Sequence, residues 1–185
     1  MSDRVAVFID GAYLDKVLQE EFNSPRIDYE KFAHWMTLGI PLFRSYYYHC
    51  LPYQSNPPTE EQRGRYVKKQ AFFNRIANLP QFDVRLGKLE FRGFKEGSEP
   101  VFIQKRVDIL LGIDLVLMAA KQRITHATIF TGDSDFLPAI TTAKNEGVIM
   151  TLGHGILNPP HEELWKVMDQ RLVLTRHLVQ SMIRP

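Results

Sequence analysis

The chain lacks the features that mark secreted and membrane proteins. Cys50 is the only cysteine among 185 residues, which excludes a disulfide within the chain and a cysteine-based zinc cluster. No apolar run approaches the roughly 20 residues that a membrane-spanning helix needs. The first predicted strand starts at residue 4, which leaves no room for a signal peptide. We therefore expect a cytoplasmic protein with no partner in the membrane.

Internal repeats and low-complexity segments are absent too, which excludes repeat arrays and disordered chains. A length of 185 residues allows one α/β domain with a full core, but not two comfortable ones. We expect one domain over residues 1–175. Residues 176–185 would then form a helical tail that packs on the domain or on a partner.

Charge is low overall but unevenly distributed. The net charge is +2, yet residues 62–106 hold eleven basic and four acidic residues, so this stretch is +7 and the rest is −5. Such an asymmetry favours a polyanionic partner such as RNA, with Arg65, Lys68 and Lys69 as candidate contacts. An ordinary solvated helix face and loop would explain the charge equally well.

The hydrophobic pattern alternates between strands and helices. Apolar runs without polar alternation, as in residues 4–10 and 126–131, are typical of strands covered on both faces of a parallel sheet. The pattern predicts strands at 4–10, 42–50, 82–91, 126–131, 148–152 and 172–174, and helices at 11–22, 28–38, 59–78, 107–122, 135–146 and 161–169. Residues 93–100 are predicted to be a polar loop. This rhythm indicates an α/β fold with a central, mostly parallel sheet.

Acidic residues follow two of these buried strands. Asp10 ends the first strand, Asp133 and Asp135 follow the strand at 126–131, and Asp108 and Asp114 lie in the intervening helix. Ligands of parallel sheets bind beyond the carboxyl ends of the strands. Acids gathered there repel one another, and a bound divalent cation relieves that repulsion. The sequence therefore predicts a Mg²⁺ or Mn²⁺ site for phosphoryl transfer.

The five acids are not equivalent. Asp10, Asp114 and Asp133 are the predicted core set of metal ligands and catalytic groups. Asp108 and Asp135 would be further ligands or would orient them. Asp108 and Asp114 lie roughly 120° apart around a helix, and Asp114 is the preferred ligand of the two. Each acid also has a structural interpretation: Asp108 and Asp135 could cap helices, and Asp10 could belong to a turn.

Other polar groups give weaker signals. Lys105, Thr131 and Ser134 could bind a phosphate, although a surface lysine and local caps are equally good explanations. Residues Tyr46–Tyr48 are predicted to alternate between strand core and strand surface rather than to stack on bases. His154 and His161 flank a Gly/Pro loop without metal-ligand spacing, and we interpret them as ordinary loop residues.

Three motifs together resemble a known family. The segments Phe8-Ile-Asp-Gly-Ala-Tyr-Leu14, Gln104-Lys-Arg-Val-Asp108 through Asp114, and Thr131-Gly-Asp-Ser-Asp-Phe136 resemble NYN domains of the LabA-like group in the PIN-like nuclease superfamily. Residues 163–172 resemble that group's closing helix and strand. The resemblance implies a three-layer, Rossmann-like α/β/α fold. It also implies a metal-dependent ribonuclease site built from the five aspartates.

One departure from the family pattern leaves the activity open. Tyr13 stands where many members have Asn, so we keep Tyr13 among the candidate substrate contacts. The leading hypothesis is a Mg²⁺- or Mn²⁺-dependent endoribonuclease that acts on single-stranded or structured RNA. The alternative is a non-catalytic RNA-binding module. A phosphatase with an aspartyl-phosphate intermediate is disfavoured, because Asp10 is followed by Gly-Ala and not by a second Asp two positions on. The sequence leaves a homodimer open.

Overall fold

The computed structural model describes residues 2–94 and 100–184, except for the side chains of 100 and 103–105. Its elements are β1 (Val5–Asp10), α1 (Gly11–Phe22), α2 (Tyr29–Met36), β2 (Leu42–Cys50), α3 (Glu60–Ala77), β3 (Phe82–Phe94), β4 (Pro100–Lys105), α4 (Val107–Ala120), β5 (His126–Phe130), a 3₁₀ turn (Ser134–Phe136), α5 (Leu137–Asn145), β6 (Ile149–His154), α6 (Glu162–Val167), β7 (Gln170–Val173) and α7 (Arg176–Met182). Every strand and helix predicted from the sequence is present.

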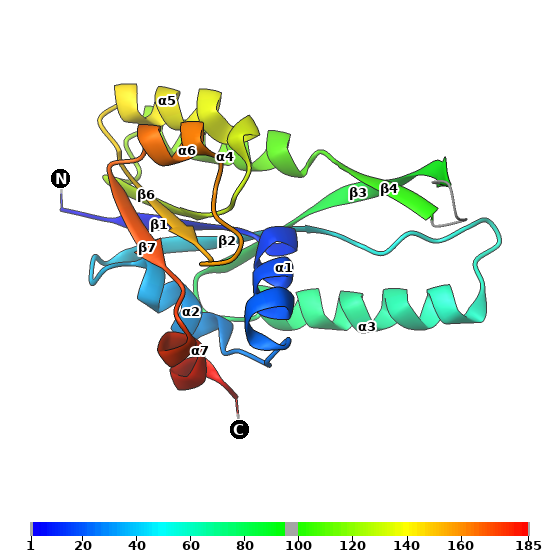
Figure 1. Ribbon diagram of the computed structural model, residues 1–185. Coiled ribbons are helices and arrows are strands. Elements are labelled where there is room, and N and C mark those ends of the chain that lie inside the picture. Colours follow the sequence, from blue (N-terminus) through cyan, green and yellow to red (C-terminus); the bar gives the residue numbers. More distant parts are fainter. Residues whose placement is uncertain (1, 95–99, 185) are drawn as a thin grey trace.

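The strands form one central sheet covered on both faces. Its order is β4-β3-β2-β1-β5-β6-β7, and every pair is parallel except β3 with β4. Helices α4, α5 and α6 lie on one face, and α1, α2, α3 and α7 lie on the other (Figure 1). The three-layer α/β/α fold is therefore confirmed.

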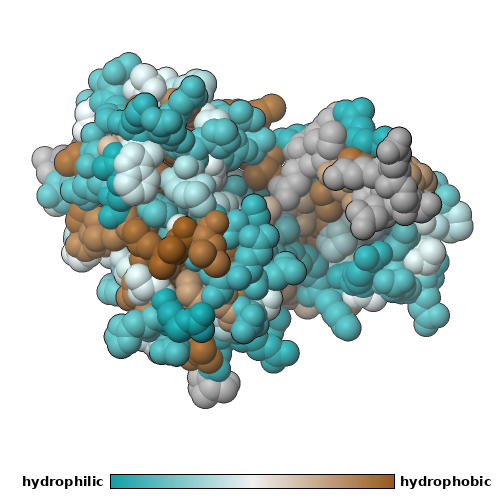
Figure 2. Space-filling model, in the orientation of Figure 1, coloured by the Kyte–Doolittle hydropathy of each residue, from teal (hydrophilic) through white to brown (hydrophobic). Residues whose placement is uncertain are grey.

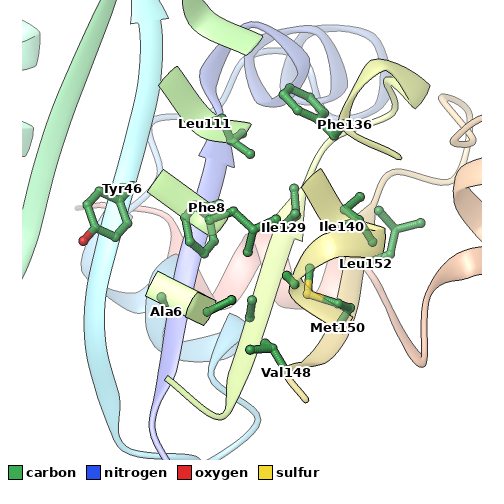
Figure 3. Close-up of a cluster of buried hydrophobic side chains, with 14 of the residues drawn as sticks. Ala6, Phe8, Tyr46, Leu111, Ile129, Phe136, Ile140, Val148, Met150 and Leu152 are labelled. Carbon is green, nitrogen blue, oxygen red and sulfur yellow. The ribbon is translucent and has the colours of Figure 1, made fainter. Parts of the chain in front are cut away.

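Each face of the sheet has its own hydrophobic core. On the α4–α5 face, side chains of β1, β5 and β6 such as Phe8, Ile129 and Leu152 point toward the helices (Figure 3). The three consecutive tyrosines divide between the faces: Tyr46 and Tyr48 join this core, and Tyr47 joins the opposite one. All three are buried, so the predicted alternation of core and surface is wrong, because helices cover both faces.

The largest departure from the sequence prediction is a β-hairpin. β3 pairs with β2 only as far as Gly87 and then continues to Phe94, paired with the antiparallel strand β4. Residues 88–94 and 100–105, which we call the arm, project from the body beside the long helix α3 (Figure 1). The predicted loop at 93–100 is thus shorter, and its residues 95–99 lie outside the described part of the chain.

The C-terminal residues form a helix, as predicted, and it packs on the domain. Val179 and Met182 of α7 are buried in the core on the α1–α2 face. The backbone amide of Asp28, which caps α2, donates to the carbonyl of Met182 at 2.7 Å. The described part of this segment therefore completes the core.

Helix starts and lengths follow local chemistry. α3 begins with a capping box, because the side chains of Thr59 and Gln62 each accept from the other residue's backbone amide. α4 is nearly all apolar, but it has only 14 residues. Across residues 2–94 and 100–184, no helix combines the length and the apolar character needed to cross a membrane.

A candidate active site at the carboxyl edge of the sheet

Neighbouring strand ends bring the first acidic residues together. β1 and β5 are parallel and adjacent, with Ile9 opposite Phe130, so Asp10 and Thr131 leave the sheet side by side. Thr131 is fully buried. Its hydroxyl donates to Asp10 Oδ2 at 3.0 Å and accepts from the amide of Asp133 at 3.2 Å. Thr131 thereby links the two strand ends, and its role as a phosphate contact stays a prediction.

Asp10 is held by hydrogen bonds on both carboxylate oxygens. Its Oδ1 accepts from the amides of Ala12 and Tyr13, both at 3.1 Å, which makes Asp10 the N-cap of α1. Burial raises the pKa of this carboxyl group above its ordinary value, although the hydrogen bonds act against that rise. The side chain of Asp10 thus caps α1 and also lies in the candidate site.

The turn after β5 presents two further acids. Asp133 Oδ1 accepts from the amide of Asp135 at 3.0 Å, so Asp133 caps the 3₁₀ turn that precedes α5. The interpretation of Asp135 as the helix cap is therefore wrong, because the chain begins to coil two residues earlier than predicted. Both aspartates are exposed, and Ser134 lies between them in the turn.

Asp108 approaches this group from α4. The N-cap position of that helix belongs to Arg106, whose φ is 76°, so the interpretation of Asp108 as a cap is also wrong. Asp108 lies in the first helical turn and is exposed. Partial burial, and then the negative charges of Asp133, Asp10 and Asp135, raise the pKa of Asp108. These four residues from three separate segments are called the acid cluster below.

Asp114 has a different environment. Its Oδ2 accepts a hydrogen bond from the Tyr48 hydroxyl at 2.9 Å and another from Arg85 Nε at 3.2 Å. The Arg85 guanidinium also lies over the Tyr46 ring, 5.4 Å from its centroid. A strand cation and a strand hydroxyl thus already engage the carboxylate. The structure favours Asp108 over Asp114 for the site, the opposite of the ranking expected from helix geometry.

A cleft of about 460 Å³ opens beside Asp10 and Asp133. Lys16 and His161 contribute to its wall, and the His161 amide donates to the carbonyl of Gly132 at 3.2 Å. Sequence reasoning missed Lys16 and classed His161 as an ordinary loop residue. The position of Lys16, one and a half turns after the Asp10 cap, was the available signal. His161 has no metal-ligand spacing in the sequence, and a backbone contact with Gly132 places it at the cleft.

A larger cleft, of about 630 Å³, lies between α3 and the C-terminal residues and has no acidic side chain in its lining. Phosphoryl-transfer chemistry that depends on carboxylates therefore belongs to the smaller cleft.

Tyr13 connects α1 to the loop after β6. Its hydroxyl donates to the carbonyl of Asn158 at 2.6 Å and accepts from the amide of Gly155 at 3.2 Å. Its ring packs so closely on Gly132 that a Cβ there would lie 2.7 Å from the ring. Burial raises the pKa of Tyr13 to about 12, so the hydroxyl stays protonated near neutral pH. Tyr13 lines the cleft, with its hydroxyl engaged by backbone groups.

The basic residues that are candidate RNA contacts differ in whether they form ion pairs within the protein. Lys69 Nζ contacts Asp15 Oδ2 at 2.9 Å, and Arg65 lies 3.8 Å from Glu61 on the exposed side of α3. Lys68 is exposed on the same helix. The side chain of Lys105 lies outside the described residues.

The donor chemistry fits a hard divalent cation. Within the described residues, no three Asp, Glu, His or Cys side chains converge closely enough to hold a metal ion by themselves. Mg²⁺ does not require such a cage, since it keeps several waters and is commonly bound by one or two carboxylates and substrate phosphates. Partial burial is the main reason for the raised pKa of Asp108, and a cation would relieve the repulsion from Asp133, Asp10 and Asp135 that adds to it.

Comparisons with known proteins agree with this architecture. The family model of the NYN domain matches residues 4–164. A crystal structure of a protein of unknown function from Vibrio parahaemolyticus has a similar fold, with a TM-score of 0.58 and 15% sequence identity, and the match covers 95% of this chain and 94% of that one. No curated protein matches the chain.

Proposed function

The chain belongs to the NYN domain family, whose members are nuclease-like, and from this membership and the acid cluster we propose that it is a metal-dependent ribonuclease. One observation carries the proposal: carboxylates from β1, α4 and the turn after β5 share one region at the carboxyl edge of the sheet. The linkage of Asp10 to Asp133 through Thr131 supports a site whose geometry is fixed before substrate binds.

The proposed roles follow from the contacts. One or two of the carboxylates of Asp10, Asp108 and Asp133 would hold Mg²⁺ or Mn²⁺ together with waters and a substrate phosphate, and Asp135 adds negative charge beside them. The metal, when bound, supplies an activated water and stabilises the charge that develops on the phosphate. Lys16 and His161 line the cleft, where cationic or hydrogen-bonding groups would contact a phosphate oxygen. Asp114 holds Arg85 and Tyr48 in place.

RNA is the proposed substrate because the family points to it and because residues 62–106 carry +7. Part of this charge comes from Lys68 and Arg65 on α3 and from the basic residues of β3. We also place the chain in the LabA-like group, on the strength of the Gly132-Asp-Ser-Asp135 motif and the helix that begins Val107-Asp108.

A non-catalytic RNA-binding module is the second candidate, and Tyr13 favours it. The Tyr13 ring occupies space against Gly132, next to Asp133, and its hydroxyl is engaged by backbone groups. A side-chain amide at this position would have been free to contact a ligand. This candidate predicts RNA binding without metal-stimulated cleavage.

The test is cleavage of end-labelled RNA by the purified chain with Mg²⁺, Mn²⁺ or EDTA, in parallel with Asp133→Asn. Asparagine caps helical turns as well as aspartate does, so this variant should keep the fold, which circular dichroism would verify. Metal-stimulated cleavage by the wild type, absent from the variant, is the expected result. RNA binding without cleavage under every condition would favour the second candidate, and equal cleavage by the variant would refute the assigned site.

A further inference from the structure

The arm extends the sheet beyond its carboxyl edge. Asp10 pairs with Tyr48, and Tyr48 pairs with Arg85, so Arg85 marks the level of the acid cluster on β3. Phe91 lies six residues farther along the strand, which is about 20 Å at 3.3 Å per residue. β4 then returns toward the body, and only Arg106 and Val107 separate its last residue from Asp108. The arm therefore leads from solvent to the acid cluster.

Four aromatic rings lie together on this arm. Phe91 is the cross-strand partner of Phe102, with ring centroids 5.8 Å apart, and Phe94 packs on Phe91 at 5.1 Å. Tyr53, from the segment after β2, contacts both Phe91 and Phe102. We call these four residues the aromatic platform. Hydrophobic surface is visible on the projecting lobe at the right of Figure 2.

The rings are unusually exposed for phenylalanine. Phe91, Phe94 and Phe102 are 38%, 67% and 41% exposed, and within the described residues Trp165 is the only other exposed Phe or Trp side chain. Cross-strand packing of Phe91 against Phe102 stabilises the ribbon and is a structural reason for those two rings. That reason does not extend to Phe94, which leaves two thirds of its surface in water.

The surroundings of the platform are basic. Residues 84–106 hold six basic and three acidic residues, so this stretch is +3. Lys88 is exposed, and Arg92 is half exposed beside Glu90. Leu89 packs against the core on the α4 face, and by strand alternation Phe91 points to that same face. The rings therefore lie on the α4 face of the sheet, which is also the side on which Asp108 lies.

From this juxtaposition we infer that the aromatic platform is a base-stacking subsite for single-stranded nucleic acid, a proposal that rests on the proposed function for its choice of RNA. Exposed rings bind unpaired bases of any sequence through their π faces, and neighbouring cations hold the phosphates. A duplex hides its base faces and would not gain from the rings. At 3.4 Å per stacked nucleotide, the 20 Å to the cluster corresponds to about six nucleotides.

Binding in EDTA tests this subsite without requiring cleavage. The full chain is titrated against a fluorescein-labelled 12-nucleotide oligouridylate and against a blunt RNA duplex of equal length. Phe94→Leu keeps an apolar side chain without a ring and should weaken binding of the single strand by about fivefold or more. Phe94→Trp keeps a ring and should bind within about twofold of the wild type. Neither variant should change duplex binding, and both should keep the wild-type melting temperature, because Phe94 is so exposed.

The outcomes separate this subsite from the proposed function. Loss of single-strand binding in Phe94→Leu supports the subsite even if the wild type cleaves nothing. Cleavage by the wild type with equal RNA binding by Phe94→Leu refutes the subsite and leaves the nuclease intact. Absence of RNA binding by the wild type refutes the subsite. A change of oligomeric state in Phe94→Leu with unchanged RNA binding would identify the platform as an interface between copies and would also refute it.

Discussion

Two aspartates of the same helix illustrate how neighbours assign a role. Asp108 and Asp114 are six residues apart in α4. Asp108 lies in the first turn, and partial burial, followed by the charges of three other carboxylates, raises its pKa. Asp114 lies less than two turns later and accepts hydrogen bonds from Arg85 and Tyr48.

The two carboxylates differ in their partners: the charge of Asp114 is already compensated, and the charge of Asp108 is not compensated by the described residues. The carboxylate of Asp114 is compensated by a guanidinium and a phenol, and its side chain is 18% exposed. Among the described residues, no basic side chain lowers the pKa of Asp108, and a divalent ion would compensate the negative charges around it. We therefore propose that Asp108 binds the metal and that Asp114 has a structural role.

The largest expected effect is on catalysis. Asp108→Asn should lower the rate of metal-dependent RNA cleavage by roughly 100-fold or more, because removal of groups that merely orient metal ligands already costs 10- to 100-fold. Asp114→Asn should stay within about tenfold of the wild type. Single-turnover cleavage rates of the two variants at saturating Mn²⁺ measure this difference. Equal reductions of the rate in both variants would contradict the assignment of different roles to Asp108 and Asp114.

A smaller effect is expected on the stability that the pair of Asp114 and Arg85 provides. Arg85→Met removes the cation from Asp114 and should lower the free energy of unfolding at pH 7 by about 1–2 kcal/mol, as measured by urea denaturation. The value is modest because the Arg85 side chain is 35% exposed and water screens the pair.

The double variant Arg85→Met/Asp114→Asn is the matched control for this pair. Without the charge on Asp114, the loss of Arg85 should cost less, so the two changes should not be additive. Additive costs would show that Arg85 acts through Asp83 or Tyr46 instead, since it also lies near both.

The smallest expected effect concerns pH. The pKa of Asp108 is raised in the folded state, so the folded protein binds this proton more tightly than the unfolded chain does. The contribution of Asp108 to stability should therefore fall as pH rises from the ordinary aspartate range through the raised pKa. In EDTA, Asp108→Asn should lack this loss and exceed the wild type at pH 7 by less than about 1 kcal/mol, because the group is exposed. Urea denaturation of both proteins at pH 4 and pH 7 measures the difference. A wild type that is more stable than Asp108→Asn at pH 7 would contradict the prediction.

The sequence predicted those parts of the fold that local chemistry decides. Apolar runs located the parallel strands, and the helix predicted at 59–78 matches α3. The hairpin partner β4 was missed because its apolar run is only three residues long, 101–103, and follows polar residues that are typical of a loop. β4 is stabilised by pairing with the extended end of β3, which is not a local signal.

The site was predictable only in part for a similar reason. Strand ends identified Asp10 and Asp133, because parallel strands place their carboxyl ends at one edge. The ranking of Asp108 and Asp114 depended on Arg85, a residue 29 positions from Asp114 that reaches it through the tertiary fold. The capping role of Asp133 instead of Asp135 depended on a 3₁₀ turn that helix periodicity does not reveal.

Direct binding of Mn²⁺ tests the central claim without any knowledge of the substrate. Electron paramagnetic resonance would follow free Mn²⁺ during titration of the wild type, Asp108→Asn and Asp114→Asn. The account predicts that the wild type and Asp114→Asn bind Mn²⁺ with similar affinity and that Asp108→Asn binds at least tenfold more weakly. Unchanged binding by Asp108→Asn, together with loss of binding by Asp114→Asn, would contradict the account and return the metal to Asp114.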